Sequence, residues 1–269
     1  ANVSTRFGFR GPAITIGSGC ATGLDMIAWA RHQIRSGAAD AAVVGATEAP
    51  LNRMLFAATC SLGILSQCNE QPHRAMKPFD AKSDGLVLSE AAVVVVLERE
   101  SMAIARGARV LGALAGAGAA AEGRNPIVLE RDGSAVSRAI RGAMTEAGMQ
   151  PTDIDCIHSH GVAINMYDRS EANAFKTALG DHAYRVPICA TKSMIGQAYA
   201  PGGLLGVSGA LMSLNRGILP PTLNLEQQDE QCNLDIVPAQ ARLNDVHTAL
   251  VTALSFGGTH SAVIVTSPR

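Results

Sequence analysis

The stretch GSGCATGLD, residues 17–25, places Cys20 among small residues where a predicted strand gives way to a predicted helix. Residues 12–16 read as the strand, and apolar residues recur at helical spacing from Leu24 to Ile34 before Gly37 ends the helix. Unpaired N–H groups in the first turn of a helix lower the pKa of a cysteine, and only the thiolate is a good nucleophile. We therefore interpret Cys20 as a nucleophile with a lowered pKa. A small buried cysteine in a tight turn is the alternative.

The composition indicates an α/β protein and argues against a nucleic-acid or membrane partner. The chain has 269 residues, of which 47% are hydrophobic and 17% are charged, with a net charge of −1. No apolar run reaches the ~20 residues that span a bilayer, and the first residues do not resemble a secretory signal. The six cysteines are scattered without a CxxC pair, which predicts mostly buried thiols in a reducing compartment, the cytoplasm.

Strands alternate with helices along the whole chain. Strands are predicted at residues 12–16, 38–46, 86–98, 108–119, 154–161, 187–193 and 248–267. The strand at 38–46 is predicted to be buried. Residues 86–98 are predicted to form two strands or a hairpin, and residues 248–267 two strands joined at Gly257-Gly258. Helices are predicted at residues 24–36, 101–107, 136–147, 170–179 and 206–215, and residues 60–85 are predicted to be surface loop in part. This alternation predicts βαβ units with mainly parallel sheets. No low-complexity linker divides the chain, so we expect its two halves to share a core.

His160 is the second candidate for chemistry. It ends a predicted strand and precedes Gly161, a typical place for a catalytic group in an α/β sheet. Cys156, His158 and His160 alternate onto one face of that strand. We rank a metal site well below catalysis, because three ligands in a row on a straight strand suit a metal poorly. The remaining alternative is a histidine near the surface whose polar atoms are hydrogen-bonded and which takes no part in chemistry.

Three further motifs are ambiguous on their residues alone. Lys192 follows a strand and is equally compatible with a buried cation beside Glu171 and with a surface lysine. SFGGTH, residues 255–260, is either a plain tight turn or a turn that presents an N–H group to an oxyanion. GAGAAA, residues 116–121, matches a dinucleotide-binding pattern, but such matches arise by chance in a chain rich in Gly and Ala, and we reject it.

Taken in order, these pieces resemble the β-ketoacyl synthases of the thiolase superfamily. Residues 11–49 resemble the nucleophile segment of that family, residues 76–98 resemble RPFDxxRDGFVxGEGA, HSHGV at 158–162 resembles NAHGT, TKSMIGQ at 191–197 resembles TKSMTGH, GILPPTLNLE at 217–226 resembles GxxPPTxNLE, and SFGGTH resembles GFGGTN. The resemblance implies a layered α-β-α-β-α architecture. It also divides the chain into residues 1–109, the remainder of the N-terminal half with the nucleophile, and residues 110–269, the C-terminal half.

The resemblance also implies roles for individual residues. Cys20 takes an acyl group from an acyl-carrier protein, and His160 is the first of two histidines that promote decarboxylation of a malonyl thioester. Lys192 belongs to a buried network with Glu171. Phe256, followed by Gly257, is the gate beside the acyl pocket, and its N–H forms the oxyanion hole together with that of Cys20. No metal or cofactor is implied, since the substrates are carried on phosphopantetheine.

The chain departs from the family pattern at three places. The second histidine is replaced by Gln197, whose amide donates a hydrogen bond but carries no proton at neutral pH. The two threonines that hold phosphopantetheine are replaced by Val162 and Ile164. The final asparagine of GGTN is His260. The residues that accept the acyl group therefore match the family pattern. The residues that bind the malonyl thioester, called the extender below, differ from it.

Family members carry sheet strands ahead of the nucleophile segment, so we expect the first sheet to be incomplete here. Unpaired strands leave bare apolar surface, which is costly. We expect a separate polypeptide or a longer chain to supply the missing strands. The resemblance further implies two-fold pairing into a homo- or heterodimer, through the strand near residues 14–16.

The preferred function is a ketosynthase that acylates Cys20 and makes a β-ketoacyl product in fatty acid or polyketide biosynthesis. Gln197, Val162 and Ile164 support a rival, an acyltransferase on the same scaffold that passes the acyl group to an amine, an alcohol or a second carrier. A third reading, a non-catalytic partner subunit, is disfavoured because such partners typically lack the cysteine.

Overall fold

Five strands form the larger of the two main sheets. The computed structural model describes residues 2–125 and 128–268. Its helices and strands are α1 (Asn2–Phe7), α2 (Thr22–Arg35), β1 (Ala41–Glu48), α3 (Arg53–Ser61), β2 (Ala91–Glu98), α4 (Glu100–Ala105), β3 (Ala113–Ala121), α5 (Ser134–Ala147), β4 (Cys156–His158), α6 (Asn165–Leu179), β5 (Ile188–Cys189), α7 (Lys192–Ile195), α8 (Gly202–Arg216), β6 (Ile218–Leu219), β7 (Arg242–Leu243), β8 (Thr248–Leu254) and β9 (Thr259–Thr266). The larger sheet has the order β3-β9-β8-β4-β5, and β1 pairs with β2 in a separate sheet.

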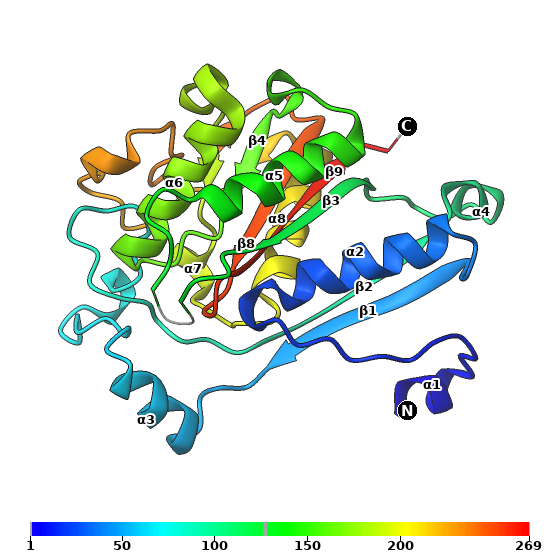
Figure 1. Ribbon diagram of the computed structural model, residues 1–269, viewed down its shortest axis with the longest axis horizontal. Coiled ribbons are helices and arrows are strands. Elements are labelled where there is room, and N and C mark those ends of the chain that lie inside the picture. Colours follow the sequence, from blue (N-terminus) through cyan, green and yellow to red (C-terminus); the bar gives the residue numbers. More distant parts are fainter. Residues whose placement is uncertain (1, 126–127, 269) are drawn as a thin grey trace.

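The layers follow from the alternation of side chains along β8 and β9. Leu250 and Ile264 belong to a core shared with α5 and α6. Val251 and Val263, which point the other way, belong to a second core shared with α2, α8, β1 and β2. Helices α5 and α6 therefore cover one face of the larger sheet, while α2 and α8 lie between the two sheets (Figure 1). This is the layered α/β arrangement that the resemblance implies.

Several sequence-based predictions are confirmed. The apolar stripe predicted for residues 136–147 is buried on α5, and Gly148 ends that helix in the left-handed conformation with φ 69°. The last two strands form an antiparallel hairpin whose turn contains Gly257 and Gly258, both with positive φ. Residues 116–121 lie within β3 rather than in a phosphate-binding turn, which agrees with our rejection of the dinucleotide motif.

Other predictions are wrong, because strand pairing depends on neighbours that the local sequence does not reveal. Residues 12–16 are extended but pair with no described strand. The sheets are mixed rather than mainly parallel, since β4 runs parallel to β5 and β8 while β3, β8 and β9 pair antiparallel. Residues 86–98 contain one strand, β2, and no hairpin: Leu86 and Leu88 bridge instead to Leu65 and Gln197. Helix α3 was not predicted.

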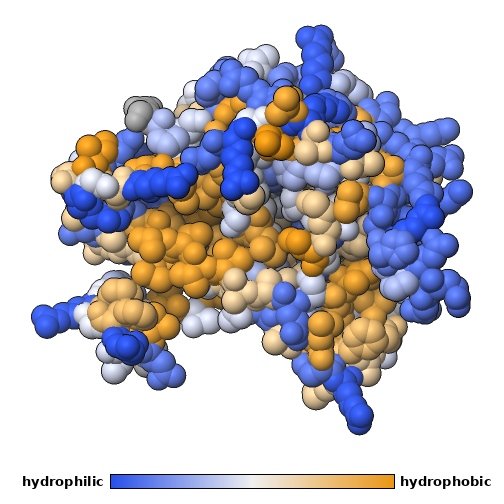
Figure 2. Space-filling model, turned by 180° about the vertical axis from the view of Figure 1, so that it is seen from behind, coloured by the Kyte–Doolittle hydropathy of each residue, from blue (hydrophilic) through white to orange (hydrophobic). Residues whose placement is uncertain are grey.

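One face of the β1–β2 sheet is exposed, so the prediction of a buried strand at residues 38–46 is wrong for half of its side chains. Val43, Val94 and Val96 point away from the core and are 43%, 66% and 63% exposed. A groove of about 1070 Å³ runs beside this sheet, between β2, α2 and residues 108–114. Seen from behind, apolar residues gather in a hollow of the surface (Figure 2). In the part of the chain that the structure describes, no helix is long and apolar enough to cross a membrane.

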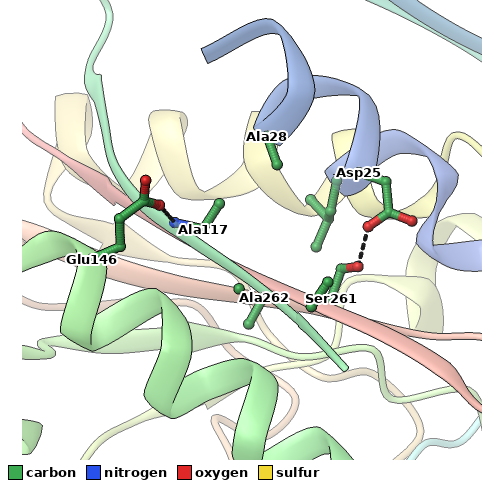
Figure 3. A pocket seen from close by; sticks show the side chains of 9 residues that line it. Asp25, Ala28, Ala117, Glu146, Ser261 and Ala262 are labelled. Carbon is green, nitrogen blue, oxygen red and sulfur yellow. Dashed lines mark hydrogen bonds between the residues drawn. The ribbon is translucent and has the colours of Figure 1, made fainter. Parts of the chain in front are cut away.

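Asp25 ties the segment around Cys20 to the larger sheet. Its carboxylate accepts hydrogen bonds from the hydroxyls of Ser18, just before the cysteine, and Ser261 on β9. Asp25 and Ser261 border a small pocket of about 230 Å³ between α2, β3 and β9 (Figure 3). The start of α2 is thus fixed to the strand that follows the 255–258 turn.

We predict that the contact between β3 and α5 depends on glycine. A Cβ atom at Gly118 would lie 2.2 Å from the carbonyl oxygen of Ala139, whereas a Cβ atom at the facing Gly142 would lie 3.5 Å from its nearest neighbour. Gly118→Ala should therefore lower the free energy of unfolding by about 1–3 kcal/mol. Gly142→Ala, the matched control within a helix, should leave it unchanged or raise it by up to about 1 kcal/mol. Thermal or urea unfolding measures both, and equal effects would contradict the packing argument.

Candidate active site

Cys20 lies in a single 3₁₀ turn, Gly19–Ala21, directly before α2. Gly19 adopts a positive φ of 60°, and a Cβ atom there would lie 3.2 Å from the Ser255 hydroxyl oxygen. That oxygen accepts a hydrogen bond from the Ala21 N–H at 2.8 Å and donates its own proton to the Ser18 carbonyl. The turn around Cys20, residues 18–21, is thus hydrogen-bonded on both sides of the cysteine to Ser255, the residue before Phe256.

The thiol of Cys20 is buried, with 3% of the residue exposed. The Gln197 side-chain amide donates to its sulfur at 3.3 Å. Burial raises the pKa of Cys20 to about 11, although Lys192, the cysteine's own N–H and Gln197 act in the opposite direction. The expectation that the helix start lowers this pKa is therefore wrong for the unliganded protein, because loss of solvent around the thiolate outweighs the nearby dipoles and charge.

His160 is held through its main chain by two buried charged groups. The Glu171 carboxylate accepts hydrogen bonds from the N–H groups of His160 at 2.7 Å and Gly161 at 2.9 Å. The Lys192 ammonium donates to the His160 carbonyl at 2.5 Å. Lys192 and Glu171 thus belong to one buried network, as the resemblance implies, with the histidine backbone between them.

The same network sets the state of the imidazole. Burial, together with the charge of Lys192, holds the pKa of His160 well below its ordinary value, so the ring is neutral at pH 7. Lys192 Nζ lies 3.4 Å from Nδ1 of that ring. We assign Nδ1 as the acceptor and place the single ring proton on Nε2. His160 therefore presents a neutral N–H donor.

Gln197 connects the thiol to this network. A Cβ atom at Gly202, at the start of α8, would lie 3.4 Å from Gln197 Oε1 and 3.5 Å from Lys192 Cε, so both side chains border that glycine. Gln197 also contacts Cys20, and the charge of Lys192 acts on the Cys20 thiol, so the thiol lies near this network. The predicted catalytic residues Cys20, His160, Gln197, Lys192 and Glu171 therefore lie together.

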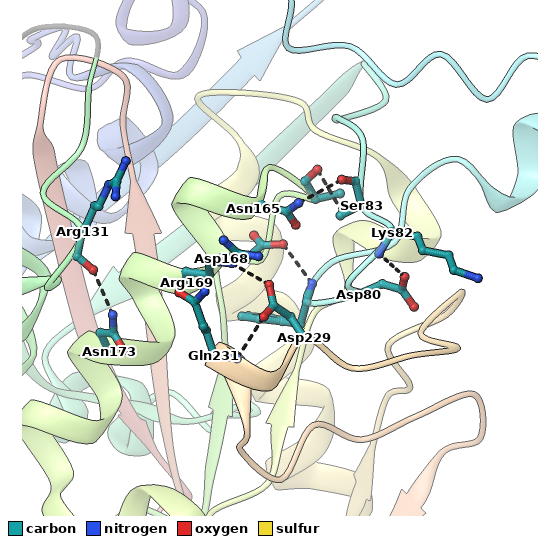
Figure 4. Close-up of polar contacts among 12 residues, drawn as sticks. Asp80, Lys82, Ser83, Arg131, Asn165, Asp168, Arg169, Asn173, Asp229 and Gln231 are labelled. Atoms are coloured by element: carbon teal, nitrogen blue, oxygen red, sulfur yellow. Dashed lines mark hydrogen bonds and ion pairs between the residues drawn. The ribbon is translucent and has the colours of Figure 1, made fainter.

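The segment after His160 is fixed by a second buried carboxylate. Asp168 accepts hydrogen bonds from the N–H groups of Val162 at 2.8 Å and Phe79 at 2.9 Å, and burial raises its pKa to about 7. Val162 is buried and Ile164 is the N-cap residue of α6. Figure 4 shows the outer part of this network, in which Arg169 pairs with Asp229 at 2.6 Å. Two apolar side chains thus occupy positions where the family pattern has threonines.

Phe256 lies in the turn between β8 and β9, with the exposed Gly257 beside it. No hydrogen bond of the Phe256 N–H to a described residue is found, and this group is available to a ligand. The Phe256 ring packs on Tyr167, with ring centroids 5.0 Å apart. Sequence reasoning missed Tyr167 and also Thr252, which donates to Glu171. Tyr167 lies in the quoted segment that supplied Glu171, whereas nothing in the local sequence marked Thr252.

The metal alternative finds no geometric support among the described residues. No group of three His, Cys, Asp or Glu side chains within residues 2–125 and 128–268 could hold an ion. Cys156 packs in the core shared with α8, and His158 contacts the Ser213 hydroxyl at 3.2 Å. Burial lowers the pKa of His158 to about 4, as expected for a neutral core histidine.

Family models match most of the chain. Residues 1–103 match the model described as beta-ketoacyl synthase, N-terminal domain, and residues 111–226 match the model described as beta-ketoacyl synthase, C-terminal domain. The chain belongs to the β-ketoacyl synthase family. This agrees with the motifs identified above and with the layered fold.

Relatives of this family span the whole chain. The tetracenomycin polyketide synthase ketoacyl synthase alpha subunit of Streptomyces glaucescens is 36% identical over 99% of the chain, which spans 63% of that protein. A ketosynthase solved in complex with its type II PKS acyl-carrier protein and bound to the hexaketide is 32% identical, with a TM-score of 0.97 over the whole chain and 66% of its own length. A beta-ketoacyl synthase from Burkholderia phymatum gives a TM-score of 0.93 at 30% identity, and the chain covers 64% of it. The chain thus spans less than two thirds of each of these relatives.

We predict that alkylation of Cys20 by iodoacetamide accelerates with pH. Because the pKa of this thiol is about 11, the thiolate fraction should rise roughly tenfold per pH unit between pH 7 and 9. The exposed Cys60 should be labelled before the buried Cys20. Peptide mass spectrometry after timed labelling measures both residues. A Cys20 rate that is independent of pH over this interval would show that the thiolate is already formed at rest.

Proposed function

We propose that the protein is a ketosynthase that transfers an acyl group from a carrier-protein thioester to Cys20 and extends it by decarboxylative Claisen condensation. The observation that carries the proposal is the buried Cys20 beside Gln197, with the Lys192–His160–Glu171 network next to it. The polyketide and fatty acid synthases among its relatives support this reaction class.

In the acylation step, the Cys20 sulfur attacks the thioester carbonyl of the acyl carrier. The carbonyl oxygen becomes an oxyanion that the Phe256 and Cys20 N–H groups stabilise. The carrier sulfur then leaves and receives the proton that the Cys20 thiol gives up. Since the thiol is protonated at rest, proton removal must accompany substrate binding or attack. This step uses neither Gln197 as an acid nor the side chains of Val162 and Ile164.

In the extension step, a malonyl thioester loses CO₂ and becomes an enolate. Its carbon attacks the acyl carbonyl on Cys20, the new carbon–carbon bond forms, and the cysteine sulfur leaves as a thiolate that takes up a proton. The Nε2–H of His160 donates a hydrogen bond to the enolate oxygen. Gln197 supplies a second, neutral donor in place of an imidazole.

The rival proposal is an acyltransferase that hands the acyl group to an amine, an alcohol or a second carrier. The observation that favours it is the loss of polar groups on the extender side, where Val162 is buried and Gln197 cannot carry a proton. A non-catalytic role is disfavoured, because Cys20 is present and the turn around it is held by the Ser255 hydroxyl.

We also propose the partners that the sequence implies. An acyl-carrier protein delivers the substrates on phosphopantetheine. Further polypeptide covers the exposed face of the β1–β2 sheet at Val43, Val94 and Val96, because an apolar sheet face of this kind is costly in water. The complete unit pairs two-fold as a homo- or heterodimer. We also propose that the chain divides between residues 109 and 110 into the two halves that the resemblance implies.

The product formed with and without malonyl-carrier tests the proposed function. We expect acyl-Cys20 from acyl-carrier alone, and a β-ketoacyl-carrier with release of CO₂ once malonyl-carrier is added. Intact-protein mass spectrometry detects both. Acyl-Cys20 that transfers to an added amine or alcohol, without CO₂ release in any mixture, would overturn condensation in favour of the acyltransferase.

We predict that Gln197→His increases decarboxylation. A preorganised donor to a developing oxyanion is worth typically ~10²–10³-fold, so a site that has an amide where the family pattern has the second imidazole should release CO₂ slowly from malonyl-carrier, while acylation of Cys20 stays fast. The variant should raise CO₂ release, alone or together with Val162→Thr, which restores a hydroxyl for the extender. Fast CO₂ release by the unmodified protein would show that Gln197 is compatible with condensation and would remove the main support for the rival.

A further inference from the structure

Tyr167 is a buried aromatic residue in the first turn of α6, between two residues of the proposed site. Its ring centroid lies 6.4 Å from that of His160 and 5.0 Å from that of Phe256. Only 2% of the residue is exposed. The side chain therefore borders both the imidazole and the turn that carries the free Phe256 N–H.

The hydroxyl of Tyr167 has no hydrogen-bond partner among the described residues. An unpaired buried hydroxyl opposes folding, so such a group in a native protein calls for an explanation. A phenylalanine would make the same ring contacts without this cost. The Oε1 atom of Gln197, whose amide nitrogen contacts Cys20, is unpaired and buried in the same way. Two unpaired polar atoms thus belong to residues grouped around the thiol and His160.

The environment of Tyr167 fixes the kind of partner that its hydroxyl can take. Burial raises the pKa of Tyr167, and negative charge at Cys20 or Glu122 raises it further, so the hydroxyl stays protonated throughout the physiological range. The influence of Cys20 on the pKa of Tyr167 also means that the phenol and the thiol interact electrostatically. A protonated phenol near a neutral His160 can donate a hydrogen bond, and a matching ligand atom is a carbonyl oxygen.

We propose that the Tyr167 hydroxyl donates a hydrogen bond to a carbonyl oxygen of the bound substrate and makes Tyr167 a specificity-determining residue. The inference rests on the proposed function, because it presupposes thioester substrates at Cys20. The carbonyl belongs either to the 3-oxo group of the acyl chain or to the extender thioester. In both cases the ligand satisfies a group that the unliganded protein leaves unpaired.

Tyr167→Phe tests this proposal, because it removes one oxygen atom and keeps the ring. The protein is used in its native assembly, and Tyr184→Phe, which removes an exposed hydroxyl elsewhere, is the control. In the first arm, Cys20 is acylated by 3-oxobutyryl-pantetheine and by butyryl-pantetheine. If the carbonyl belongs to the acyl chain, the unmodified protein is acylated faster by the 3-oxo substrate than by the butyryl substrate. Tyr167→Phe then lowers that rate ratio roughly tenfold and leaves butyryl transfer unchanged.

In the second arm, butyryl-loaded protein is supplied with malonyl-pantetheine. If the extender is the source, Tyr167→Phe raises the malonyl-pantetheine concentration needed for half-maximal turnover roughly tenfold and leaves acylation by both acyl donors unchanged. A third measurement is the melting temperature without substrate. It should be unchanged or higher in Tyr167→Phe, because the lost hydroxyl had no partner to stabilise it.

The outcomes separate the inference from the function on which it rests. A selective loss in either arm supports Tyr167 as a substrate contact and identifies the source of the carbonyl. No loss in either arm, an equal loss that includes butyryl transfer, or a lower melting temperature overturns the inference and assigns the hydroxyl a structural role or none. If neither thioester acylates Cys20 in the unmodified protein, the proposed function itself fails.

Discussion

The position of His160 depends on two opposite charges buried on either side of its backbone. Glu171 accepts from the N–H of His160, and Lys192 donates to its carbonyl. Burying either charge alone would cost several kcal/mol, so each requires the other and requires the peptide groups between them. This constraint fixes the end of β4, the start of α7 and one turn of α6 relative to one another. It also leaves Lys192 beside Nδ1 of the imidazole. Burial, together with this charge, holds the pKa of His160 well below its ordinary value, and the ring proton is assigned to Nε2.

Burial has the opposite consequence at the thiol. A helix start, a lysine and an amide donor all act to stabilise a thiolate at Cys20, yet its pKa is raised to about 11 because water is excluded. The sulfur therefore rests as a thiol. The same surroundings favour the acyl thioester, which is neutral and loses little on desolvation. The site is thus better suited to holding an acyl group than to holding a free thiolate.

The sequence predicts local structure well where one helix face decides it, and poorly where partners are distant. The stripe on α5 and the hairpin at Gly257-Gly258 could be predicted because periodicity and turn residues are local signals. The pairing of Leu88 with Gln197 could not, since it joins segments more than 100 residues apart. Lys192 was ambiguous by its residues alone, and only the resemblance assigned it to the interior. The role of Thr252 depends on the register of β8 against β4, which no motif reveals. The pKa of Cys20 was predicted with the wrong sign because sequence shows the helix start but does not show how much solvent is lost.

The altered residues form a chemically coherent set. By the resemblance, the amide of Gln197 stands where the family pattern has a proton-carrying histidine, and the apolar Val162 and Ile164 stand where it has two hydroxyls. A buried phenol, Tyr167, lies beside them. Each of the two polar groups donates a hydrogen bond without exchanging a proton at neutral pH. In the proposed reaction Gln197 and Tyr167 therefore bind and orient the substrate and do not act as acid or base. A site of this kind stabilises developing charge on oxygen by fixed neutral donors, and its rate depends on how accurately the substrate carbonyls meet those donors. Selection among acyl groups and control of the reaction then rest on the same contacts.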